Sequence, residues 1–157
     1  MRVTMRSKGQ ALVEFTLVFV LLIIIAWIPA DFGLAFYTGQ LALNASREGA
    51  RIAAADPDLL AKITPQTCAI PCASASDLHK AAADRISSAL LPGATVTVQY
   101  PFSGSACNEV VRVSVQGQYN FFYYQLLRLV GVTVPDAVNV NRFTDMRWEH
   151  QVSCAPF

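Results

Sequence analysis

Residues 15–30 read FTLVFVLLIIIAWIPA, sixteen consecutive residues without a charge. A transmembrane helix needs about 20 mainly apolar residues, and residues 11–13 and 32–37 extend the apolar character past Glu14 and Asp31. This stretch predicts one N-terminal membrane span. A cleaved secretory signal peptide is disfavoured because no small-x-small site separates the run from a polar start. A buried core helix would leave the basic residues that precede the run unexplained.

The charges around the apolar run predict the orientation of the span. Arg2, Arg6 and Lys8 precede it, and the first acidic residue is Glu14. Because basic residues stay on the cytoplasmic side, we expect a cytoplasmic N-terminus and an exported C-terminal part. Twelve basic and eleven acidic side chains give the chain a net charge of +1. They form no basic patch in the sequence, so a nucleic-acid partner is not expected.

Composition divides the chain into three parts. Residues 1–9 form a basic leader, residues 10–55 a transmembrane helix that extends beyond the membrane, and residues 56–157 an exported domain. The helical composition from residue 31 onward is free of proline and stops at Asp56-Pro57.

Small residues recur along the extended helix with intervals of four and three. At about 100° per residue they share one narrow stripe, and small residues let another backbone approach closely. This packing stripe consists of Ala35, Gly39, Ala42, Ser46, Gly49 and Ala53. It is suited either to the protein's own sheet or to helices of neighbouring subunits.

The exported domain has the pattern of a small α+β fold. We expect a second helix over residues 77–91, with His79 on its polar side, and two strands over 95–100 and 111–116, where apolar and polar residues alternate. A third strand is expected over residues 137–148. The first two strands are expected to be antiparallel. The fold prediction is therefore a long N-terminal helix laid against a small antiparallel sheet. The aromatic cluster at residues 121–124 fits either a core or a surface patch.

Four cysteines lie in the predicted exported domain. Three full pairings of Cys68, Cys72, Cys107 and Cys154 are possible, and an oxidising compartment favours disulfides. We favour Cys68–Cys72, which is local, together with Cys107–Cys154.

The start of the apolar run carries a short motif, Lys8-Gly9-Gln10-Ala11-Leu12-Val13-Glu14-Phe15. A small residue ends the leader, and a lone carboxylate follows five positions later. Glu14 is either a charge tolerated at the membrane interface or part of a motif that resembles the type IV pilin processing site. That resemblance implies cleavage between Gly9 and Gln10. It also implies an assembly contact at Glu14 and Phe15, with the carboxylate paired to a neighbouring subunit's new amino terminus.

Longer stretches resemble the TadE-like family, the pseudopilins or minor pilins of tight-adherence (Tad, type IVc) pilus systems. They are GQALVEFTLVFVLLIII (9–25) and DFGLAFYTGQLALNASREGARIAA (31–54), with weaker echoes at 95–102 and 143–150. The resemblance implies a pilus subunit or assembly factor in the bacterial cytoplasmic membrane. Its implied partners are other pilin subunits, an inner-membrane assembly platform, a prepilin peptidase and membrane lipid.

No nucleophile motif, glycine-rich phosphate loop or metal box stands out in the sequence. We therefore expect neither a catalytic role nor a cofactor. The alternative to a pilus subunit is a membrane-anchored envelope binding or adhesion protein that never enters a filament.

Overall fold

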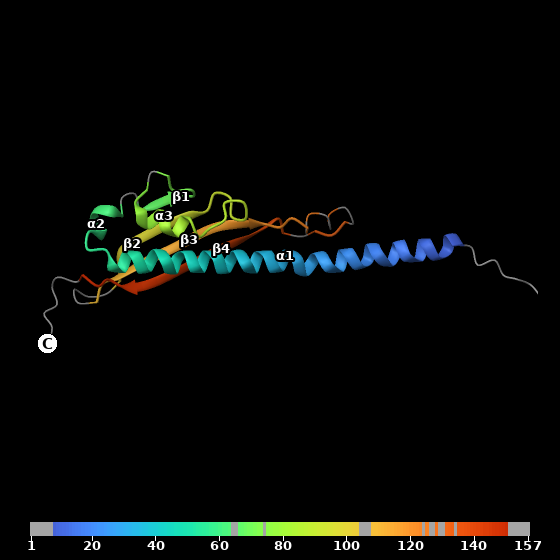
Figure 1. The fold of residues 1–157 in the computed structure, drawn as a ribbon, viewed down its shortest axis with the longest axis horizontal. Helices are drawn as coiled ribbons and strands as arrows, with labels where there is room; N and C mark the ends of the chain where they lie inside the picture. Colours follow the sequence, from blue (N-terminus) through green and yellow to red (C-terminus); the bar gives the residue numbers. More distant parts are fainter. Residues whose placement is uncertain are drawn as a thin grey trace, which may run out of the picture.

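The computed structural model describes residues 8–63, 66–73, 75–103, 108–123, 125, 128, 131–133 and 135–150. One helix, α1 (Lys8–Ala55), dominates the molecule. Its 48 residues span about 72 Å at 1.5 Å per residue. The domain lies along the C-terminal part of α1, and residues 9–22, which are all exposed, project from it as a bare rod (Figure 1). The predicted α+β class, with a long helix against an antiparallel sheet, is confirmed.

Four antiparallel strands form the sheet in the order β1-β2-β3-β4. Their bounds are β1 Thr67–Ala69, β2 Thr95–Ser103, β3 Val110–Asn120 and β4 Ala137–Arg147. The three predicted strands are present, and the two predicted from alternation, β2 and β3, run further than the pattern indicated. The three-residue β1, which pairs with β2, was missed because it is too short to show a period.

Alternation sets which face of the sheet is inside. The β-branched residues Val96, Val98, Val111, Val113 and Val115 are fully buried. The residues that alternate with these valines along β2 and β3 are polar and lie on the opposite face of the sheet. There, Arg112 of β3 pairs with Asp145 of β4. Period-two side chains on strands point to opposite faces, so the buried row lies on the face that α1 and α3 cover.

Two short helices complete the domain, α2 (Leu59–Lys62) and α3 (Asp77–Ala83). The predicted helix over 77–91 is therefore too long: after Ala83 the chain forms tight turns, including bonds from Leu90 and Leu91 N–H to Ser87 O. Serine competes for backbone hydrogen bonds and weakens helix interiors, which fits an early stop before Ser87-Ser88.

His79 was expected on the polar side of its helix, and that prediction was wrong. The side chain is fully buried, with Nδ1 2.8 Å from Ser76 Oγ. Helix α3 packs against both α1 and β2, so two adjoining faces of a short helix are covered. Burial lowers the pKa of His79.

The C-terminal end of α1 is held by the chain that follows β4. Glu149 N–H donates to Ala54 O at 2.9 Å, and Trp148 Nε1–H donates to Asp56 O at 2.9 Å. His150 Nε2 lies 3.0 Å from Ala55 O. The last carbonyls of a helix have no partner within it, so these residues fix the far end of α1 to the sheet.

Candidate membrane and assembly segment

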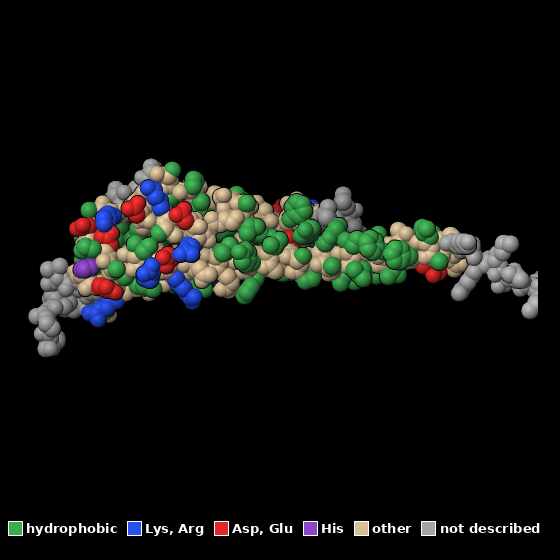
Figure 2. Space-filling model, in the orientation of Figure 1, with side chains coloured by type: hydrophobic (Ala, Val, Ile, Leu, Met, Phe, Trp, Pro, Cys, Tyr) green, Lys and Arg blue, Asp and Glu red, His purple; other side chains and the backbone are tan. Residues whose placement is uncertain are grey.

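The N-terminal half of α1 has no cover from the domain over most of its length. Leu12 and Phe15 are 67% and 68% exposed, and partial cover begins only at Ile23. Residues 9–30 measure about 33 Å as a helix, which matches a hydrocarbon core of about 30 Å. Figure 2 shows hydrophobic side chains along this rod. By length and composition, α1 is able to cross a membrane as a single span.

The predicted processing and assembly residues lie together at the start of the rod. Gly9, Gln10, Glu14 and Phe15 are all exposed, and an added Cβ at Gly9 would meet no atom within 4 Å. Gln10 Nε2 donates to Glu14 Oε1 at 3.1 Å, as expected of side chains one turn apart. Among the described residues this is the hydrogen bond that Glu14 accepts, so its carboxylate is open to a partner from outside the chain.

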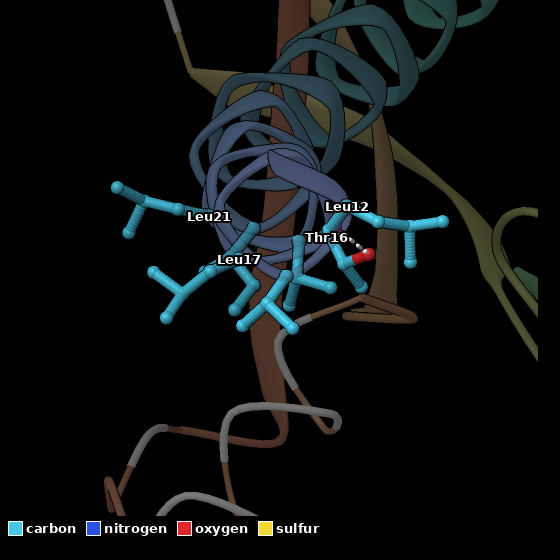
Figure 3. Close-up of a pocket in the computed structure, with 7 residues that line it drawn as sticks. Leu12, Thr16, Leu17 and Leu21 are labelled. Carbon is cyan, nitrogen blue, oxygen red and sulfur yellow. Dashed lines mark hydrogen bonds between the residues drawn. The ribbon is translucent and has the colours of Figure 1, made fainter. Parts of the chain in front are cut away.

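One side of the rod forms a shallow apolar groove. Its lining residues are Leu12, Val13, Thr16, Leu17, Val20, Leu21 and Ile24. Figure 3 shows Thr16 among them, with its hydroxyl turned to the helix backbone. Thr16 Oγ1 donates to Leu12 O at 2.8 Å, so the one polar side chain of the groove is satisfied within α1. That arrangement suits a lipid environment, where an unpaired polar group is costly.

Asp31 marks the level at which the domain begins to cover α1. Its side chain is fully buried, and it accepts hydrogen bonds from Phe122 N–H at 3.2 Å and Tyr123 N–H at 2.7 Å. Tyr119 Oη lies 3.4 Å away. The carboxylate thus fastens the connection after β3 to the helix. In the sequence Asp31 only interrupts the apolar pattern, and its structural role was missed because its partners are about 90 residues away.

Aromatic rings surround this carboxylate. Trp27 stacks on Tyr123 with centroids 5.7 Å apart, and Phe32 meets Phe121 edge-on at 6.2 Å. Burial, followed by the negative charge of Asp31, raises the pKa of Tyr119. The aromatic cluster predicted to be either core or surface is in fact both, since Phe121 is buried and Phe122 is 71% exposed.

The small-residue stripe faces the domain. Ala42, Ser46 and Ala53 are fully buried, and a Cβ on Gly49 would lie 3.0 Å from Val113 Cγ1. Gly39 is close to the guanidinium of Arg142.

Contacts from the stripe reach three elements. Ser46 Oγ is 2.8 Å from Thr144 Oγ1 on β4, Val113 belongs to β3, and Ala82 of α3 approaches Gly49. Ala35 packs at the edge of the same core. The stripe therefore seats the chain's own sheet and α3.

Cys68 and Cys72 form a disulfide with a Cα–Cα distance of 5.4 Å. The favoured Cys107–Cys154 pair lies outside the described residues. Within the described ranges, no group of three or more His, Cys, Asp or Glu side chains is placed to hold a metal ion.

The family model described as TadE-like protein matches residues 9–51. No curated protein and no solved structure matches the chain. The matched stretch holds the bare rod, Asp31 and most of the packing stripe, whereas the sheet lies outside it. Residues 9–51 are thus similar to the TadE-like proteins that this family model describes.

Proposed function

We propose that this chain is a structural pseudopilin or minor pilin that takes part in assembly of a Tad-type (type IVc) adhesion pilus. One observation carries the proposal. The N-terminal part of α1 is an exposed apolar rod with the carboxylate of Glu14 near its start, and the C-terminal part of the same helix packs on a folded domain. The TadE-like match over the same residues supports it.

The proposed orientation places the N-terminus in the cytoplasm and the domain on the exported side of the cytoplasmic membrane. Arg2, Arg6 and Lys8 precede the span, and basic residues favour the cytoplasmic side. The Cys68–Cys72 disulfide supports an oxidising compartment for the domain, because disulfides are rare in the cytosol.

Processing would occur between Gly9 and Gln10, by a prepilin peptidase. Cleavage there leaves an amino terminus one helical turn from Glu14, as the Gln10–Glu14 hydrogen bond shows. A charged carboxylate costs about 2.5–3.5 kcal/mol at the centre of a bilayer and less near its surface. Pairing with the amino terminus of a neighbouring subunit would offset that cost and fix the relative height of two subunits. The further partners proposed are the inner-membrane assembly platform and membrane lipid.

Two measurements test the proposal. Mass spectrometry of protein from cells is expected to find a chain that starts at Gln10. In sheared surface fractions, Glu14→Leu is expected to be missing while it remains in the membrane fraction. Thr16→Leu is the matched control, because it changes a polar residue two positions away whose hydroxyl, among the described residues, bonds to its own helix.

Two results would contradict the proposal. Unchanged incorporation of the Glu14→Leu chain would remove the pairing role. A chain that keeps residues 1–9 in every fraction would instead favour a permanently anchored envelope binding or adhesion protein.

A further inference from the structure

The exposed surface of α1 stays apolar well beyond the point where the domain begins. Phe32, Phe36 and Tyr37 are 53%, 70% and 53% exposed. Polar side chains take over the exposed face only from Gln40 onward, with Arg47 further along. Figure 2 shows this hydrophobic surface continuing from the rod on to the domain-covered half. The domain therefore overlaps an apolar length of helix instead of starting where that length ends.

The apolar length is greater than the hydrocarbon core requires. From Leu12 to Tyr37 the exposed apolar surface covers about 39 Å of helix. The hydrocarbon core is about 30 Å thick, and the bilayer with its headgroups is about 40–45 Å. The last turns before Gln40 therefore fall at headgroup level, where aromatic side chains are enriched in membrane proteins.

The domain presents an exposed aromatic residue at the same level. Phe122 is 71% exposed, and its backbone N–H is fastened to Asp31 on α1 at 3.2 Å. The neighbouring Tyr123 stacks on Trp27. Because Asp31 is buried and hydrogen-bonded, the only carboxylate of α1 at this level is kept away from lipid. We call Phe32, Phe36, Tyr37 and Phe122 the aromatic collar.

The shape of the collar distinguishes a lipid surface from a second protein chain. Phe32 and Tyr37 point about 140° apart around the helix axis, and Phe122 comes from the connection after β3. A lipid interface surrounds a membrane protein on all sides, whereas a neighbouring helix covers one stripe. We propose that the collar docks in the lipid headgroup region on the domain side of the membrane. The domain then lies against the bilayer before assembly. This inference rests on the proposed membrane anchoring and adds a lipid-contacting surface of the folded domain.

Tryptophan quenching tests the collar in the full chain. The protein is reconstituted in phosphatidylcholine–phosphatidylglycerol vesicles whose acyl chains carry bromine near the headgroup. The probes are Phe36→Trp and Phe122→Trp, each in a Trp27→Phe background. Both probe positions are highly exposed, and phenylalanine at position 27 keeps an aromatic ring against Tyr123. Arg47→Trp in the same Trp27→Phe background is the matched control, because position 47 lies on the same side of α1 about 16 Å further from the membrane. Trp148 contributes the same signal to every variant.

Both probes are expected to be quenched at least as strongly as Trp27 in the unmodified chain, and the Arg47→Trp control is expected to be unaffected. Probes that behave like the control while Trp27 is quenched would overturn the collar and leave the span intact. An unquenched Trp27 would overturn the membrane anchoring as well. Quenching that falls as the protein-to-lipid ratio rises would mean that a second copy covers the collar, which also overturns the proposal.

Discussion

Replacing Asp31 by alanine removes the acceptor that fastens the connection after β3 to α1. Two backbone donors lose their partner, Phe122 N–H and Tyr123 N–H, which lie 3.2 Å and 2.7 Å from the carboxylate oxygens. A donor left unpaired in the protein costs about 1–3 kcal/mol. Because Phe122 is largely exposed, water reaches part of this site, and we expect a total of about 2–4 kcal/mol.

Hydrogen exchange measures this loss locally. With about 1.36 kcal/mol for each tenfold change in a rate or equilibrium, the Asp31→Ala chain should exchange roughly 30- to 900-fold faster in a peptide covering residues 119–123. The centre of β3, residues 111–116, serves as an internal reference and should change little. Asp31→Asn keeps one acceptor oxygen, so its acceleration should be intermediate.

The control is Gln40→Ala, a change at an exposed position of the same helix. It should leave both peptides unchanged. If the 119–123 peptide of a folded Asp31→Ala chain exchanges at the rate of the unmodified chain, the carboxylate does not hold this connection and the placement of the collar loses its support.

Comparing Gly49→Ala with Gly33→Ala isolates the effect of close packing on stability. Both changes replace a glycine inside α1 by alanine, so both gain the same helix propensity. An added Cβ meets Val113 at 3.0 Å at position 49 and no atom within 4 Å at position 33. Urea unfolding in detergent should therefore give Gly49→Ala a free energy of unfolding about 1–3 kcal/mol lower than that of Gly33→Ala. Equal unfolding midpoints would contradict the packing. Burial and the hydrogen bond to Glu109 raise the pKa of Tyr100 to about 12, against about 10 in an unfolded chain. A raised folded pKa gives stability below pH 10 that is lost as pH rises to 12. Tyr100→Phe should therefore have a shallower loss of stability over that pH range, and an identical slope would refute the assignment.

Local patterns in the sequence account for much of the fold. The spacing of Ala42, Ser46 and Gly49 defines a helix stripe, and alternation at Val111, Val113 and Val115 defines the inner face of a strand. Both patterns work because a side chain's direction follows from the period of its own element. Where elements were short, as with β1 and α3, the period had too few residues to be read correctly.

The sequence by itself determined the apolar rod, the position of Glu14 at its start, the antiparallel strands and the order of the segments. Only the tertiary structure decided that Asp31 is a buried fastening point, that His79 lies inside, and that Phe122 stands beside the helix at the level of the collar. The physical reason is distance along the chain: Asp31 and Phe122 are separated by 91 positions. Periodicity tells which way a side chain points, but it does not tell which distant backbone group meets it.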